Sequence, residues 1–164
     1  MTIITATSED FETIRNIAYK TWPETYGKIL GLEQLAYMLD RIYTTAALQQ
    51  TITEKNHQYL LIKENDQYLG FASYQHDYLG LNVTRLHKLY LLPETQGRGA
   101  GKLLIDAIET MARNNHSEKV SLNVNRFNNA LSFYQKSGYS IVGEEDIDIG
   151  NGYLMEDYKM EKIL

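Results

Sequence analysis

The chain contains no cysteine and only two prolines among its 164 residues. The absence of cysteine excludes disulfides, a thiolate nucleophile and a cysteine-ligated metal site, and we expect no bound metal. No apolar run approaches the ~20 residues that a membrane-spanning helix requires. The first residues lack the basic and apolar regions of a signal peptide. These absences lead us to expect a cytoplasmic protein without a membrane partner.

Positive charge is also in short supply, because 16 Lys and Arg residues stand against 21 Asp and Glu residues, for a net charge of -5. Nucleic-acid-binding proteins are usually basic, so we expect no nucleic-acid partner. A cationic substrate would instead be attracted. With 43% hydrophobic and 23% charged residues, no repeat and no linker, residues 1–164 are expected to form a single domain.

The spacing of apolar residues predicts an alternation of helices and strands. Helices are expected at about 9–21, 32–42 and 45–53, after Gly101, and from Asn128 to Gly138, with Pro23 ending the first of them or starting a turn. Strands are expected at 2–6, 59–63, 68–75, 86–92, 119–125, 139–149 and 153–161. This order favours an α/β fold with a sheet of mixed direction.

The most informative stretch joins the strand at 86–92 to the helix after Gly101. Pro93 closes the strand, and a glycine-rich turn follows it: Gln96-Gly97-Arg98-Gly99-Ala100-Gly101. Three glycines let backbone N–H groups converge at the start of a helix, where the helix dipole adds positive potential. Such a turn is typical of an anion site, most often one for phosphate.

Two common phosphate motifs do not fit this turn. The P-loop requires Ser or Thr after its lysine, but Leu103 follows Lys102. The dinucleotide motif requires a third glycine where Lys102 stands. The pattern Gln-x-x-Gly-x-Gly, after a strand that ends Leu-x-Leu-x-Pro, resembles the pyrophosphate loop of the GNAT superfamily, the Gcn5-related N-acetyltransferases.

This resemblance implies a GNAT fold, with a mixed central sheet of about seven strands flanked by four to five helices. It implies acetyl-CoA as co-substrate and direct attack by an amine in a ternary complex. It also implies cofactor contacts from the last strand residues and the turn: Leu89, Tyr90, Leu91, Gln96, Gly97, Arg98, Gly99, Ala100, Gly101 and Lys102.

A second block resembles the same superfamily, whose core there reads Asn-x-x-Ala-x-x-x-Tyr-x-x-x-Gly-[Phe/Tyr]. By this resemblance Asn128 contacts the pantetheine arm of the cofactor, and Asn123 and Lys136 are expected to be further cofactor contacts. Tyr134 would donate a proton to the departing thiolate, a role that suits a phenol with a pKa of about 10. Tyr134 also shares a helix face with Ala130, so a purely structural role is the alternative.

The attacking amine must lose a proton, and His87 is the predicted base because histidine titrates near neutral pH. Without a bulge, His87, Leu89 and Leu91 share one strand face. The resemblance places the backbone N–H that polarises the thioester carbonyl near Leu91. If His87 is the base, we expect an acid limb near its ordinary pKa of about 6.5 in the pH–rate profile. Tyr74 and Glu33 are weaker alternatives.

The C-terminal stretch, with residues 18–26, 34–38 and 86–93, resembles the PaiA-like spermidine/spermine N-acetyltransferases. This predicts a small-molecule amine partner, such as a polyamine, that carboxylates between Glu144 and Asp157 would attract; an ordinary solvated acidic hairpin is the alternative. A protein or peptide amine as acceptor, and a CoA-binding regulatory module without turnover, remain open, as does a homodimer. The predicted substrate-binding residues are Trp22, Tyr26, Tyr74, Glu145 and Tyr153.

Overall fold

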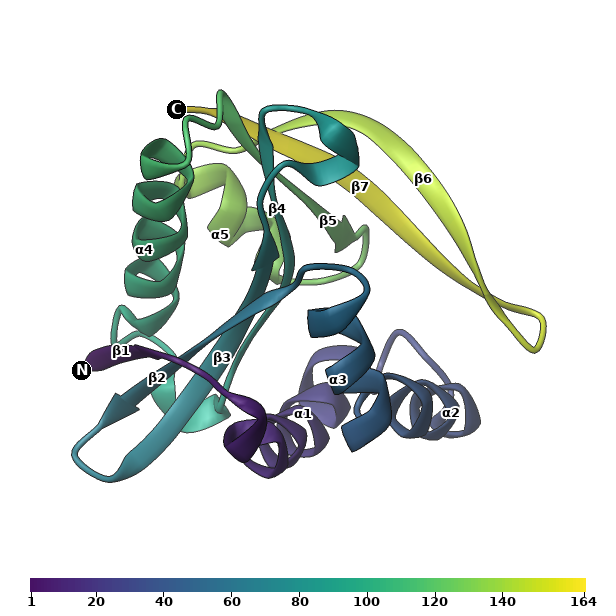
Figure 1. Ribbon diagram of the computed structural model, residues 1–164. Coiled ribbons are helices and arrows are strands. Elements are labelled where there is room, and N and C mark those ends of the chain that lie inside the picture. Colours follow the sequence, from purple (N-terminus) through teal and green to yellow (C-terminus); the bar gives the residue numbers. More distant parts are fainter.

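The computed structural model describes residues 1–164, and one seven-stranded sheet organises them (Figure 1). The strand order is β1-β2-β3-β4-β5-β7-β6, and every neighbouring pair is antiparallel except β4 and β5. The strands are β1 (Thr2–Thr5), β2 (Gln58–Glu64), β3 (Gln67–Gln75), β4 (Val83–Leu91), β5 (Lys119–Asn125), β6 (Ser140–Gly150) and β7 (Tyr153–Ile163). The predicted mixed sheet of about seven strands is confirmed.

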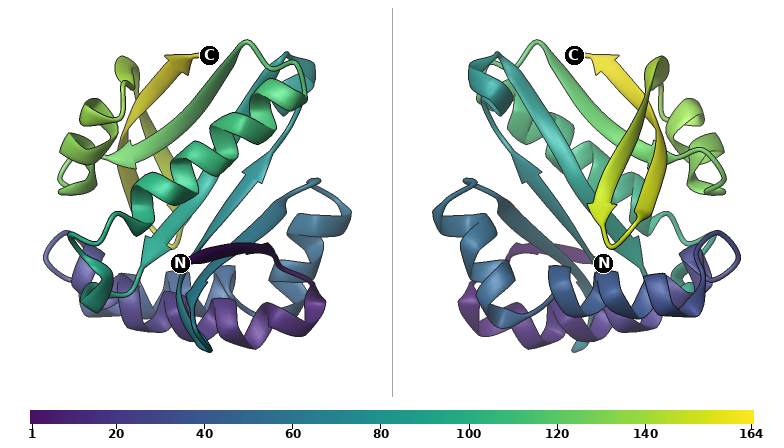
Figure 2. Two further views of the ribbon diagram at one scale, coloured as in Figure 1. Left: turned by 90° about the vertical axis from the view of Figure 1, so that its left-hand side faces the viewer. Right: turned by 90° about the vertical axis from the view of Figure 1, so that its right-hand side faces the viewer.

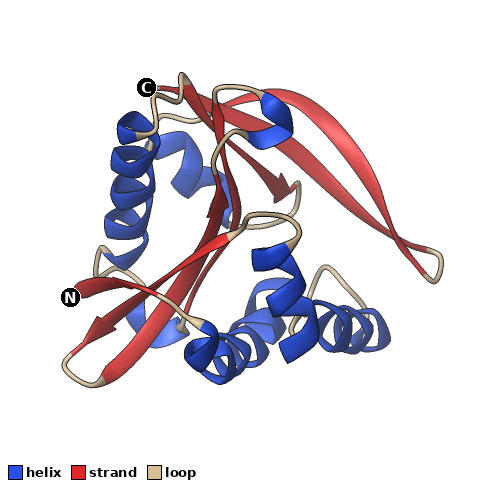
Figure 3. Ribbon diagram, viewed as in Figure 1, coloured by secondary structure: helices blue, strands red, loops and turns tan.

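Five α-helices flank the sheet (Figure 3). They are α1 (Phe11–Tyr26), α2 (Leu32–Ile42), α3 (Thr45–Thr53), α4 (Ala100–Asn114) and α5 (Ala130–Lys136). No helix is long and apolar enough to cross a membrane.

Two hydrophobic cores lie on opposite faces of the sheet. Alternate residues of β2 divide between them, as the two-residue period of a strand requires. Tyr59 and Leu61 face α1, α2 and α3, whereas Leu60 and Ile62 face α4. Figure 2 shows α4 lying across one face while α1, α2 and α3 gather at the other. The sheet therefore separates two layers of helices.

The expectation that Pro23 ends the first helix is wrong, because α1 continues through Pro23 to Tyr26. A proline this close to the end of a helix removes one intrahelical hydrogen bond. Trp22 and Tyr26, on either side of it, are only 3% and 7% exposed. Their burial favours the last turn by more than the single lost bond costs.

The sheet opens between β4 and β5, and this opening positions the site. Their parallel pairing runs only from Val83 opposite Lys119 to Leu86 opposite Leu122. Beyond Leu86, β4 continues to pair with β3 alone. Figure 1 shows the end of β5 diverging from β4. The second half of β4 therefore has one edge without a neighbouring strand.

Candidate active site

The glycine-rich turn adopts the backbone conformation that its sequence predicts. Gly97 and Gly99 have φ values of 75° and 79°, in the left-handed region that favours glycine, and α4 starts at Ala100. No backbone carbonyl accepts a hydrogen bond from the N–H of any of the five loop and first-turn residues Gly97, Gly99, Ala100, Gly101 and Lys102. These donors lie at the positive end of the α4 dipole, so the turn is suited to bind a pyrophosphate.

Gly101 has a different reason to be glycine. A Cβ atom there would lie 3.2 Å from the Phe133 ring and 3.3 Å from a Leu91 methyl group. The missing side chain thus lets α4 approach both α5 and the end of β4. This close packing holds the glycine turn beside the open edge of the sheet.

The two basic residues of the turn already have partners. Arg98 forms an ion pair with Glu64, and Lys102 forms one with Asp106. All four side chains are exposed, so these pairs contribute little to stability and can exchange for a phosphate. The predicted role of Arg98 and Lys102 in cofactor binding therefore requires their carboxylate partners to be displaced.

The open edge of β4 presents unpaired backbone donors. The N–H of Leu92 bonds to the carbonyl of Leu69 at 2.8 Å. Because hydrogen-bonded and non-bonded pairs alternate in an antiparallel ladder, Tyr90 also bonds to β3 while Leu89 and Leu91 point their N–H groups toward β5. β5 has already diverged there. A thioester carbonyl at this edge could accept a hydrogen bond from either N–H.

Tyr134 lies on α5 and is only 7% exposed. Its hydroxyl makes no hydrogen bond within the chain, although its ring lies 5.2 Å from Phe133 and 6.0 Å from Tyr139. Burial, and secondarily the nearby Tyr26, raises the pKa of Tyr134 above its ordinary value. The phenol is therefore protonated at neutral pH and has a free donor, as a general acid requires.

The other predicted cofactor residues have different environments. Asn128 accepts a hydrogen bond at 2.9 Å from the N–H of Ala130, the first residue of α5. Asn123 accepts one from Arg85 at 2.6 Å and donates to Glu145 and Asp157. Asn123 therefore belongs to a side-chain network with Arg85, Glu145 and Asp157, whereas Lys136 is exposed at the end of α5.

His87 does not share a strand face with Leu89 and Leu91, contrary to expectation. The β3–β4 register passes from Ser73 opposite Lys88 to Tyr74 opposite Leu86, so His87 is the extra residue of a β-bulge. Consequently His87 and Lys88 both line the pocket described below, while the Leu89 and Leu91 side chains pack toward α4. The sequence around His87 contains no glycine that would have indicated a bulge.

His87 stacks on His57, with ring centroids 3.9 Å apart. Its Nε2 lies 3.1 Å from the Gln75 side-chain amide oxygen. Burial, followed by the charges of His57 and Lys88, lowers the pKa of His87 to about 2. The imidazole is thus neutral at any working pH, and the expected acid limb near pH 6.5 cannot come from it.

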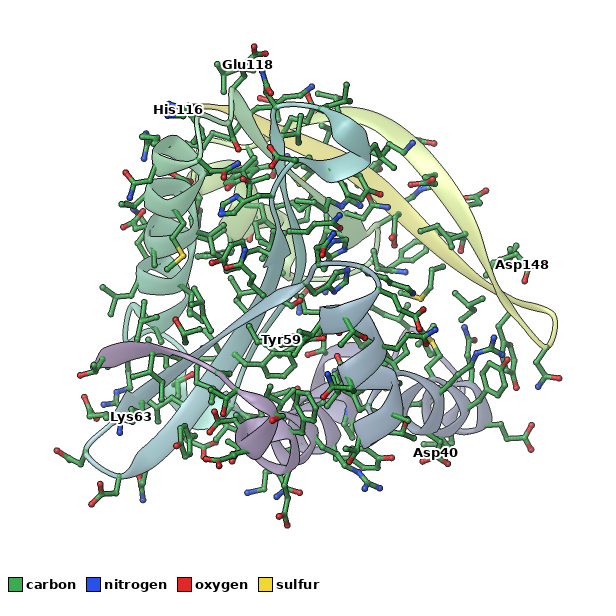
Figure 4. All side chains as sticks on the ribbon, viewed as in Figure 1. Asp40, Tyr59, Lys63, His116, Glu118 and Asp148 are labelled. Carbon is green, nitrogen blue, oxygen red and sulfur yellow. The ribbon has the colours of Figure 1, made fainter.

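A pocket of about 740 Å³ opens beside β4 and extends to α2, α3 and the β6–β7 hairpin. Trp22, Tyr26 and Tyr90 form its aromatic wall, with the Tyr26 and Tyr90 hydroxyls 3.1 Å apart. Figure 4 shows Asp148, one of the residues that line this pocket, on the β6–β7 hairpin. No group of three or more His, Cys, Asp or Glu residues could hold a metal ion.

The pocket includes only part of the predicted substrate set. Trp22 and Tyr26 line it, whereas Glu145 reaches it only through its bond to Asn123. Tyr153 packs edge to face against the pocket residue Tyr37, with ring centroids 5.7 Å apart. Tyr74 does not line the pocket, because its side chain is buried in the core beside α4 and donates to Gln58, on the far face of the sheet. Glu33, the weaker base candidate, is exposed and does not line the pocket.

One carboxylate in the pocket was not singled out from the sequence. Asp157 lies on β7, is 7% exposed, and its Oδ1 has no hydrogen-bond partner. Its other oxygen receives a weak bond of 3.4 Å from Asn123. Burial raises the pKa of Asp157, although Asn123 opposes that shift. An unpaired buried carboxylate is costly without a partner, so Asp157 is suited to bind a positively charged amine.

Comparisons with known proteins agree with this geometry. Residues 29–162 match the family model described as an acetyltransferase (GNAT) domain. The chain belongs to the GNAT acetyltransferase family. It is 28% identical over 153 residues to the spermidine N(1)-acetyltransferase of Thermoplasma acidophilum, covering 90% of this chain and 91% of that one. It is also 28% identical over 97 residues to the peptidyl-lysine N-acetyltransferase YjaB of Escherichia coli, covering 58% of each.

Among solved structures, the PaiA N-acetyltransferase of Thermoplasma acidophilum in complex with coenzyme A superposes with a TM-score of 0.82. It is 26% identical, and the match covers 100% of both chains. The protein is therefore an N-acetyltransferase that uses acetyl-CoA. The free N–H groups of the glycine turn and of β4 are the positions in this chain that fit the pyrophosphate and the thioester.

Proposed function

We propose that this protein transfers the acetyl group of acetyl-CoA to a primary amine of a small molecule that enters the pocket beside β4. The transfer occurs by direct attack in a ternary complex. The observation that carries this proposal is the unpaired Asp157 carboxylate, because it lies in the same pocket as Tyr26 and Tyr90 on the open side of β4. An ammonium bound to Asp157 would donate to the oxygen that the chain itself leaves without a hydrogen bond.

In the proposed mechanism, the bound ammonium passes one proton to Asp157, which releases it to solvent. The neutral nitrogen then attacks the thioester carbonyl carbon, and the Leu91 N–H stabilises the negative charge that develops on oxygen. The carbon–sulfur bond breaks, and the thiolate takes the proton of Tyr134. The second proton of the nitrogen leaves as the amide forms and restores Tyr134 through solvent. The net products are the acetylamide, CoA and one proton.

A polyamine is the acceptor that the sequence predicts, and the spermidine-acetylating relative supports it. Of the hairpin carboxylates, however, only Asp148 and Asp157 line the pocket. Arg126 pairs with Glu144 and Asp146, and Lys159 pairs with Glu145. The hairpin therefore attracts cations less strongly than its composition suggests.

A second acceptor class is favoured by a specific observation at the other end of the pocket. Lys55 and Lys88 line it there, and neither forms an ion pair. An amine that also carries a negative charge could place its ammonium at Asp157 and its negative charge at Lys55 and Lys88. A polyamine would instead bring a second positive charge close to the two lysines.

The proposed function is tested by incubating the protein with acetyl-CoA and single amines. We expect amine-dependent release of CoA, measured with a thiol reagent, and an acetylated product detected by mass spectrometry. Absence of CoA release with polyamines, monoamines, amino acids and lysine peptides would contradict acetyl transfer and leave a CoA-binding regulatory role.

Replacing Asp157 with Asn should lower kcat/KM for the best amine by about tenfold or more, because the change removes the counter-charge and the proton acceptor. Steady-state kinetics at saturating acetyl-CoA measure the effect. Glu156→Gln is the matched control, since it removes the same charge one residue away, where Glu156 is exposed. Equal effects of the two variants would show that Asp157 acts only through overall charge.

Replacing His87 with Gln should leave the shape of the pH–rate profile unchanged between about pH 5 and 9. The pKa of His87 is lowered to about 2, so the neutral form predominates throughout this range and no proton is gained or lost. Profiles of kcat/KM for both proteins provide the measurement. An acid limb near pH 6.5 that is present in the wild type and absent from the variant would restore His87 as the base.

A further inference from the structure

The end of the pocket beside α3 is a cluster of basic side chains without an acid. Lys88 reaches it from the β4 bulge, and Lys55, His57 and His87 lie around it. His57 and His87 are neutral, because the pKa of His57 is lowered to about 4 and that of His87 to about 2, mainly by burial. The two lysines therefore supply the charge at this end.

Lys88 has no partner of opposite charge. Its ammonium makes no ion pair and no hydrogen bond, and it lies 6.0 Å from the ring centroids of both Tyr43 and Tyr59. Burial and the positive charge of Lys55 lower the pKa of Lys88 to about 8, and no carboxylate opposes that shift. A cation so placed is costly unless a ligand supplies the missing negative charge.

The other charged side chains near this end interact with groups of the chain itself. Arg85 donates to Asn123 at 2.6 Å, and Glu145 and Asp157 oppose the lowering of its pKa. Glu54, next to Lys55, accepts a hydrogen bond from Gln50 and does not line the pocket. Lys88 thus lacks any polar partner within the chain, and Asp157 keeps one oxygen without a hydrogen bond although Arg85 lies near enough to oppose the rise that burial causes in its pKa.

We propose that Lys88, assisted by Lys55, binds a carboxylate of the acceptor, so that the substrate is a primary amine with a distant carboxylate. This inference rests on the proposed acetyl transfer and names its substrate class. Lys88 lies on β4 and Asp157 on β7, with β5 between them. Two strand spacings separate their backbones by about 10 Å or more. The carboxylate therefore lies several bonds from the acetylated nitrogen, farther than in an α-amino acid.

Three amines of one chain length test this assignment: 5-aminopentanoate, pentylamine and cadaverine, whose far ends are anionic, neutral and cationic. We expect kcat/KM for 5-aminopentanoate to exceed the other two values by about tenfold or more. Lys88→Met should lower that value by a similar factor and leave pentylamine nearly unchanged, while exposed Lys20→Met should change none. A wild-type preference for cadaverine or pentylamine would overturn the assignment. An equal loss with all three amines would also do so, and would make Lys88 a base or a structural residue.

Binding of pentanoate separates this inference from the proposed function, because pentanoate has no amine to acetylate. Calorimetry on the folded protein with CoA bound should detect pentanoate, with affinity reduced about tenfold or more in Lys88→Met. Absence of binding, or equal binding by the variant, would overturn the carboxylate site. Pentanoate binding without any amine acetylation would instead overturn the proposed transfer and leave the carboxylate site standing.

Discussion

Replacing Gly99 with Asp should abolish binding of acetyl-CoA. The Gly99 N–H is one of the free donors at the start of α4, and its φ of 79° disfavours any side chain. The aspartate would place a negative charge where the pyrophosphate binds, at the positive end of the helix dipole. Calorimetric titration of CoA into the folded variant measures the loss. Wild-type affinity would show that the pyrophosphate binds elsewhere.

The hairpin between β6 and β7 provides a matched control for this variant. Gly152 has a φ of 77°, and a Cβ atom added there, as at Gly99, would meet no other atom within 4 Å. Gly152→Asp therefore carries a similar backbone strain and the same charge, without the helix N-terminus. It should bind CoA as the wild type does. Loss of binding in both variants would point to backbone strain rather than to the phosphate site.

Much of the fold could be predicted because its local signals agree with its tertiary packing. The apolar spacing of α2 and α3 gave their bounds, 32–42 and 45–53, and alternation gave β5 at 119–125. Pro23 misled the prediction because its local preference was outweighed by burial of Trp22 and Tyr26 on the same turn. Such burial depends on partners far away in the sequence and has no local signature.

Those parts of the candidate site that one continuous chain segment forms could be predicted from the sequence. The parts that bring together residues from different strands were harder to predict. The glycine turn is local, so its conformation followed from residues 96–101. The bulge at His87 depends on the register with β3, which no motif reports. Asp157 stands among several other acidic residues, so composition alone did not distinguish it. It shares its strand face with Met155, and both residues line the pocket. That alternation was the signal that could have identified it.

Replacing Tyr134 with Phe should lower kcat by about 10²–10⁴-fold, the usual contribution of a positioned proton donor. The affinity for acetyl-CoA should stay nearly unchanged, because the ring packs as before and its hydroxyl makes no hydrogen bond within the chain. Single-turnover kinetics and CoA titration separate the two quantities. A wild-type kcat would make Tyr134 a packing residue, and a collapse of affinity would assign it to cofactor binding.

Tyr139→Phe is the control that isolates the hydroxyl of Tyr134 from the packing of α5. The two rings lie 6.0 Å apart in one core, but the Tyr139 hydroxyl donates to Glu109, which also pairs with Lys162 at 2.8 Å. Removal of the Tyr139 hydroxyl should cost about 1 kcal/mol of folding stability and leave kcat unchanged. A drop in kcat equal to that of Tyr134→Phe would mean that the core around α5, and not a proton from Tyr134, limits turnover.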